Sequence, residues 1–231
     1  MRALAICFVS SLMLVSCLNK AEIGEGKDVN PESIFYDYRI WAEEESPNVT
    51  VMLQYRFGGE EGTTLVLEEP SKVSLDGMPL RFDSAKLTGA FYEHVRPIED
   101  FVGRHTIEFT DNKAEIHKET FQFLPFSLKE EIPETIKMQP FSINLKDFPA
   151  EPTKIRLVMI DTAFDSPDVN EEMMVRNGLI PVSQKFLSRL VEGPITMEIY
   201  REEETPLKNA SKEGGRLLMT YGLRRQFAFA E

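Results

Sequence analysis

Residues 49–57 read VTVMLQYRF, and every odd position of this stretch carries an apolar side chain. The preceding segment 34–41, IFYDYRIW, places its aliphatic and tyrosine side chains at the even positions. Side chains of a β-strand point alternately to opposite faces, so this period of two indicates half-buried strands of an antiparallel sheet. Ser-Pro-Asn at 46–48 and the glycine pair at 58–59 mark the turns on either side.

The same pattern continues along the first half of the chain. Asp76-Gly77 is a strong signal for a hairpin turn. Short strands separated by turn residues every ~8–12 positions are typical of a β-sandwich, so we predict one over residues 32–127. The further strands that we expect in it are 63–67, 72–75, 79–82, 90–95, 104–110 and 116–126.

A polar segment with prolines, 128–140, follows as the expected linker, and the strand pattern then restarts in 141–231. We expect a short helix after an N-cap at Ser183, because apolar side chains from Phe186 to Val191 share one helical face. The predicted fold class is therefore all-β, with two small antiparallel Ig-like β-sandwich domains and one short helix in the second. The strands expected in the second domain are 141–145, 154–160, one within 175–182, 195–201 and 216–229, with an irregular acidic stretch at 161–172.

The composition excludes two classes of function. The chain has 26 Lys and Arg against 38 Asp and Glu, a net charge of −12. A nucleic-acid partner is not expected, because phosphate backbones are bound by clustered basic residues. The two cysteines, Cys7 and Cys17, both lie near the N-terminus, which excludes a disulfide scaffold and a cysteine zinc site in the body of the protein.

The N-terminus has the features of an export signal. Arg2 precedes an apolar run that is too short to span a bilayer, and residues 1–16 are the predicted signal peptide. The run ends in Leu14-Val15-Ser16-Cys17, which resembles the lipobox of bacterial lipoproteins. An open alternative is a plain signal peptide next to which Cys17 is incidental.

The lipobox resemblance implies that Cys17 carries the lipid, after cleavage before this residue. Two or three acyl chains give stable membrane attachment where one does not. Residues 17–31 then form the lipidated cysteine and a flexible tether, with Leu18 where an aspartate would favour inner-membrane retention. The expected location is the outer membrane, lipid-anchored, with the body facing the periplasm or the surface.

Candidate ligand contacts are few. Trp41 and Phe35 lie on the face of their strand opposite the apolar one, where exposed rings stack on sugars. Asp161, Asp165 and Asp168 are clustered oxygen ligands of the kind that Ca²⁺ uses, although the spacing does not match an EF-hand. The alternatives are a ring packed at a junction and a solvated acidic loop.

The sequence contains no recognisable catalytic motif. The histidines His94, His105 and His117 fall on separate expected strands without paired ligand spacing, so we interpret them as sheet-surface residues. Gly-x-Ser-x-Gly, P-loop and dinucleotide-binding patterns are absent from the sequence, and no cofactor is expected.

The lipobox followed by tandem β-sandwiches resembles uncharacterised envelope lipoproteins of Bacteroidota. This resemblance implies a non-enzymatic binding or structural module with an envelope protein as partner. The alternative is a glycan-binding accessory lipoprotein of a nutrient-uptake system, and an envelope hydrolase is the third reading. Likeness of fold alone does not assign function.

Overall fold

The computed structural model describes residues 22–163 and 165–230. The predicted signal peptide 1–16, with Leu14, Val15 and Ser16 of the lipobox, lies outside the described residues, as does Cys17. Among the described residues, no helix is long and apolar enough to cross a membrane.

The first half of the chain forms strands and two short 3₁₀ turns. The alternation at residues 34–41 and 49–57 is confirmed, because the predicted inward side chains of both stretches are buried up to Tyr55. Phe57 is an exception, since it ends its strand and is 48% exposed. The elements are β1 (Ile23–Glu25), η1 (Pro31–Ser33), β2 (Ile34–Glu43), β3 (Asn48–Phe57), β4 (Thr63–Val66), β5 (Lys72–Leu75), β6 (Met78–Pro79), β7 (Arg81–Ala85), β8 (Gly89–Pro97), η2 (Ile98–Asp100), β9 (Gly103–Thr110) and β10 (Ile116–Phe123).

The second half adds strands and the expected short helix. The helix begins after Ser183 but has a single turn, since the next residues turn toward Gly193, where a strand begins with positive φ. A strand also begins at Val169, inside the stretch expected to be irregular. The elements are β11 (Ser127–Leu128), β12 (Thr135–Lys137), β13 (Phe141–Lys146), β14 (Thr153–Ile160), β15 (Val169–Val175), β16 (Leu179–Val182), α1 (Gln184–Leu187), β17 (Gly193–Ser211) and β18 (Gly214–Ala230).

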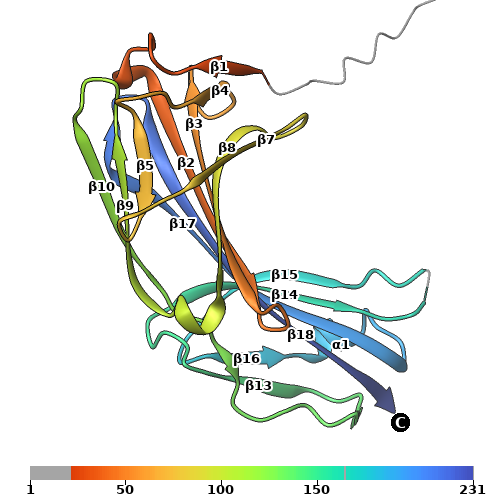
Figure 1. The fold of residues 1–231 in the computed structure, drawn as a ribbon. Coiled ribbons are helices and arrows are strands. Elements are labelled where there is room, and N and C mark those ends of the chain that lie inside the picture. The colour runs from red at the N-terminus through yellow and green to blue at the C-terminus, as the bar shows by residue number, and fades with distance from the viewer. Residues whose placement is uncertain (1–21, 164, 231) are drawn as a thin grey trace, which may run out of the picture.

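One large sheet runs through both halves of the molecule, and we call it the spine sheet (Figure 1). Its main path is β1-β4-β3-β2-β18-β17-β14-β15; β8 also pairs with β3, β7 with β8, and β12 with β18. A sheet of β10-β9-β5-β6 covers it in the first half, and a sheet of β11-β13-β16 lies opposite it in the second. The all-β class with one short helix is therefore confirmed.

The hairpin of β17 and β18 belongs to both halves. Residues 215–222 of β18 pair in parallel with β2, whereas residues 228–230 pair in parallel with β12. Residues 196–200 of β17 pair with β14. We call the part around β2 and β3 the first unit and the part around β14 and β15 the second unit. The domain limits 32–127 and 141–231 stay a prediction, to which the structure adds a hairpin common to both units.

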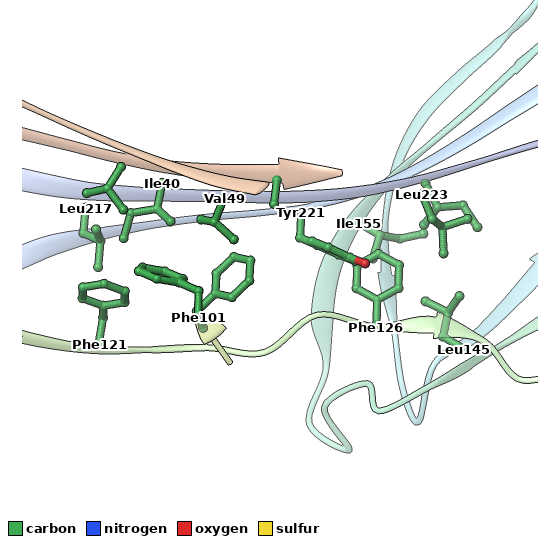
Figure 2. Close-up of a cluster of buried hydrophobic side chains, with 14 of the residues drawn as sticks. Ile40, Val49, Phe101, Phe121, Phe126, Leu145, Ile155, Leu217, Tyr221 and Leu223 are labelled. Atoms are coloured by element: carbon green, nitrogen blue, oxygen red, sulfur yellow. The ribbon is translucent and has the colours of Figure 1, made fainter. Parts of the chain in front are cut away.

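The buried side chains form one continuous core along this hairpin (Figure 2). At one end Ile40, Val49 and Leu217 face Phe101 and Phe121 of the first unit. At the other end Leu223 and Ile155 face Phe126 and Leu145 of the second unit. Tyr221 lies between the two ends, and its ring meets that of Phe126 edge to face at 5.0 Å. The apolar contact therefore continues without a break across the predicted linker.

Candidate binding surface

The spine sheet has one face that neither smaller sheet covers, and we call it the open face. The two units meet at an angle, and the open face lies on the inner side of that angle, between β8 and β15 (Figure 1). Trp41 and Phe35 of β2 both stand on it, as the alternation of the strand requires. The bend thus turns the open face into a concave surface that spans both units.

Trp41 and Phe35 lie apart on this surface. Trp41 is 38% exposed and pairs with Thr50 on one side and Thr220 on the other. Phe35 is half-buried and lies six residues earlier in the same strand, which places it roughly 20 Å away. The two rings therefore do not form one stacking platform, and Trp41 takes part in none of the ring pairs among the described residues.

Between them lies a buried carboxylate held by arginines. Asp37 is 1% exposed and accepts hydrogen bonds from Arg39 at 2.8 Å and from Arg216 of β18 at 2.9 Å. Arg56 of β3 adds a third positive charge at 3.8 Å. Burial by itself would raise the pKa of Asp37, but the hydrogen bonds from Arg216 and Arg39 outweigh it and hold the pKa below its ordinary value. This network links β3, β2 and β18 side by side.

A charged hollow lies where β14, β15, β17 and β18 run together, and Thr220, the strand neighbour of Trp41, lines it. Arg156 spans it, with Nη2 at 2.7 Å from the carboxylate of Glu172 and 3.1 Å from that of Glu202. Glu202 pairs with Thr220, which is also the neighbour of Trp41. The hollow therefore ends one strand away from Trp41 and offers both signs of charge.

Arg225 connects the units at their junction. Its guanidinium donates to both carboxylate oxygens of Glu131, at 2.7 and 3.1 Å, and also to Glu44 after β2. The hydrogen bonds that Arg225 donates to Glu131 and Glu44 raise its pKa further above its already high value. The residue ties the hairpin to the end of β2 and to the predicted linker.

The acidic candidates are only partly brought together. Asp161 accepts hydrogen bonds from the amides of Ala163 and Val191, both at 2.8 Å, and its own amide lies 3.4 Å from Oδ1 of Asp168. Burial by itself would raise the pKa of Asp161, but the hydrogen bonds from these amides outweigh it and lower the pKa. Asp165 is exposed. The Asp161 carboxylate thus fixes the loop, and Ca²⁺ binding by the three residues stays a prediction.

The histidines differ from the expected surface residues. His105 is buried, with Nδ1 at 2.8 Å from Asp76 and its ring stacked on Phe101 at 3.9 Å. The prediction that His105 lies at the sheet surface is therefore wrong. Phe101, which covers its ring, follows η2, and the alternation of the strands does not reveal where η2 lies. His117 lies in the one group of three His, Asp or Glu side chains with metal-binding proximity among the described residues, together with Asp111 and Glu115.

Sequence reasoning did not identify Asp37, Arg216 or Arg225 as network residues. Arg216 lies 179 positions from Asp37, and Arg225 lies 181 positions from Glu44. A charged residue in a strand gives no sign of its partner at such separation. The one available signal was Asp37 itself, a carboxylate between two aromatic residues of a mostly buried strand.

No protein-family model matches this sequence, and no curated protein matches it. Among solved structures, the adhesin InvE of Yersinia pseudotuberculosis is similar with 11% identity and a TM-score of 0.24, over 87% of this chain and 60% of that chain. This chain thus spans less than two thirds of the InvE structure. The two-domain IG1+IG2 structure of DIP-gamma has 10% identity and a TM-score of 0.22, over 81% and 94% of the two chains. At these values the matches assign neither a family nor a function.

Proposed function

We propose that this protein is a lipid-anchored, non-enzymatic binding module of a bacterial outer membrane. The observation that carries the binding role is the concave open face, which one continuous sheet forms across both units. The shared hairpin and the continuous core oppose bending at the junction, so the face is preorganised for a ligand. The lipobox ending at Cys17 supports the membrane anchor.

The partner that suits the open face best is another envelope protein. The face carries paired charges around Arg156 and a buried network around Asp37, and Trp41 is the single exposed tryptophan beside them. An exposed aromatic anchor with a rim of charged side chains is typical of protein interfaces, where charge complementarity selects the partner.

Site-specific photo-crosslinking tests this surface. A photoreactive amino acid at Thr220, next to Trp41, should crosslink to a discrete partner in intact cells. The matched control is the same substitution at Thr120 of β10, which is exposed on the far side of the four-stranded sheet. Equal crosslinking from both positions, or none from Thr220, would contradict a specific partner on the open face.

The anchor is tested separately. Cys17→Ser should move the protein from the membrane fraction to the soluble fraction and abolish labelling by a clickable fatty acid. Cys7→Ser is the control, since that residue lies within the predicted signal peptide. A Cys17→Ser protein that remains membrane-bound and labelled would show that the lipidation prediction is wrong.

The alternative is glycan binding, and the exposure of Trp41 favours it. One ring gives a single stacking position rather than a row, which predicts weak binding to a terminal sugar. A glycan array with the wild-type protein and Trp41→Ala distinguishes the cases: binding that depends on Trp41 supports the glycan reading, and an empty array leaves the protein partner.

A further inference from the structure

Three potential metal ligands meet at the turn between β9 and β10. Asp111 follows β9 and is buried, Glu115 ends the turn and is exposed, and His117 is the second residue of β10 and is half-buried. One ligand atom from each side chain lies within 4.8 Å of the other two. The turn therefore brings one imidazole and two carboxylates to a single point.

The two nitrogens of His117 both face acceptors. Nδ1 lies 3.2 Å from the carbonyl oxygen of Asn209 in β17, and Nε2 lies 3.3 Å from Oδ2 of Asp111. If Nδ1–H donates to the carbonyl, then either a proton on Nε2 or a metal ion bound to it must lie between Nε2 and the carboxylate. Two ligands at about 2.0–2.1 Å from one tetrahedral zinc ion lie roughly 3.3 Å apart, which is the observed spacing.

His105 provides the contrast within the same sheet. Its Nδ1 is 2.8 Å from Asp76, a direct hydrogen-bond distance, and its Nε2 is 2.9 Å from the carbonyl oxygen of Phe101. It belongs to no group of three ligands among the described residues. The direct hydrogen-bond distances at His105 leave no space for an ion, whereas the longer spacing at His117 and the third ligand at Glu115 fit a metal ion.

The supporting groups also fit a metal centre. Oδ1 of Asp111 accepts the amides of Lys113 and Glu115, at 2.8 and 2.9 Å, which fixes the carboxylate with Oδ2 toward His117. The Nδ1 contact of His117 with a backbone carbonyl is the usual outer contact of a metal-binding histidine.

An unpaired hydroxyl lies beside this group. Tyr36 of β2 is 1% exposed, and its ring meets that of His117 edge to face at 5.6 Å. Its buried hydroxyl has no hydrogen-bond partner among the described residues. Burial first, then the negative charge of Asp111, raises the pKa of Tyr36, with a smaller contribution from Glu115. A buried donor of this kind, on a ring that contacts His117, is suited to a hydrogen bond with a water or carboxylate held at a metal.

We propose that Asp111, Glu115 and His117 bind a divalent transition metal, Zn²⁺ in the first instance, with a fourth position open to water. The imidazole favours zinc over Ca²⁺, which takes six to eight oxygen ligands. The site would join three segments, since His117 contacts β17 and Asn112 donates to the carbonyls of Gly26, Lys27 and Val29. A bound ion would thus fasten the segment 26–29 to the closed end of the hairpin.

Zinc binding by the full-length protein tests this site. The purified protein is dialysed against Zn²⁺, and bound metal is measured by mass spectrometry with an indicator competition for the affinity. We expect one ion per chain and a thermal midpoint that rises with Zn²⁺ concentration. Glu115→Gln changes an exposed side chain, so the fold is kept, and it should weaken binding by roughly 10–100-fold. His117→Gln should weaken binding by at least about 100-fold, and Tyr36→Phe by roughly tenfold.

The matched control is His105→Gln, which removes a histidine of the same sheet without touching the three ligands. It should lower stability and leave the Zn²⁺ affinity of the folded fraction unchanged. The proposal is overturned if the wild-type protein binds no Zn²⁺, if Glu115→Gln binds as tightly as the wild type, or if Ca²⁺ alone raises the thermal midpoint. If added Zn²⁺ leaves the thermal midpoint unchanged at every pH, a hydrogen bond and not a metal ion joins His117 to Asp111, and the proposal is overturned.

Discussion

The cores of the two units are built from different side chains. Tyrosine rings fill much of the first unit, where the hydroxyls of Tyr38 and Tyr55 lie 3.3 Å apart and the Tyr92 hydroxyl accepts the amide of Leu67 at 2.6 Å. The core of the second unit is mainly aliphatic and also holds buried phenylalanines such as Phe126, Phe227 and Phe229. Its fully enclosed side chains include Leu157, Met159, Val169, Ile180, Leu187, Ile195, Met197 and Ile199.

This difference teaches how each unit is specified. An aliphatic core contributes through buried apolar area and tolerates few voids. In the tyrosine core, the hydroxyls of Tyr38, Tyr55 and Tyr92 also need hydrogen-bond partners, and burial raises the pKa of Tyr55 and Tyr92 because it disfavours the charged form. Such polar atoms fix which strands lie opposite one another. The β17–β18 hairpin therefore joins the second unit, whose core depends on apolar packing, to the first unit, whose core depends also on hydrogen bonds.

The largest effect is expected from a cavity in the second unit. Leu157 is fully buried, and Leu157→Ala should lower the free energy of unfolding by about 3 kcal/mol. Because β17 and β18 belong to both units, the first unit should lose stability with it. Trp41 fluorescence reports the first unit, and its urea transition should coincide with that of far-UV circular dichroism. A Trp41 transition unchanged by the substitution would mean that the units unfold independently.

The next effect concerns the network that joins β18 to β2. Arg216→Ala removes a hydrogen bond to a buried carboxylate and should cost about 2 kcal/mol at pH 7. The folded pKa of Asp37 is lowered, so its stabilising contribution is present above the unfolded pKa of about 4 and disappears as the pH falls through the folded pKa. The difference between variant and wild type should therefore shrink toward pH 3 in urea titrations, and a constant difference across pH would refute the assignment.

A smaller effect is expected from one hydroxyl of the first core. Tyr38→Phe removes a hydrogen bond with Tyr55 and should cost about 1 kcal/mol, since the ring and its packing remain. Phe227→Leu in the second unit is a comparison that changes volume without any hydrogen bond. If Tyr38→Phe leaves the thermal midpoint unchanged, the Tyr38–Tyr55 hydrogen bond does not stabilise the first unit, and the proposed difference between the two cores is wrong.

The smallest effect is expected at the junction. Arg225 is partly exposed, so Arg225→Ala should cost about 1 kcal/mol or less, and this cost should decline in high salt. Small-angle scattering should show the same particle dimensions as the wild type, because the continuous hairpin and core set the angle between the units. A marked change in dimensions would instead assign the angle to the ion pairs.

The alternation of residues predicted most of the strands and the all-β class. It missed β15 (Val169–Val175), because the buried Val169 is followed by Asn170, Glu171 and Glu172, whose amide and acidic side chains are exposed or half-buried and give no apolar alternation. It placed the helix correctly but too long, since spacing of apolar residues does not reveal that Leu190 packs as part of a turn. Local patterns record which face of a strand is buried, not the partner that buries it.

Candidate site residues show the same limit. The sequence predicted that Trp41 faces away from the core, and its exposure agrees with this. Comparing the three histidines only with one another overlooked the carboxylates near His117. Asp111, Glu115 and His117 lie within seven positions of one another. A turn followed by a strand is sufficient to bring these side chains together, so this signal was present in the sequence.

The sequence by itself determined most of the strands, their inward faces, the acidic surface and the expectation of a lipid anchor, because each of these follows from neighbouring residues. Only the tertiary structure decided that the last hairpin serves both units, that Arg216 reaches Asp37 and that the open face is concave. These depend on pairings between segments as much as 179 positions apart, whose free energy comes from contacts that no local pattern encodes.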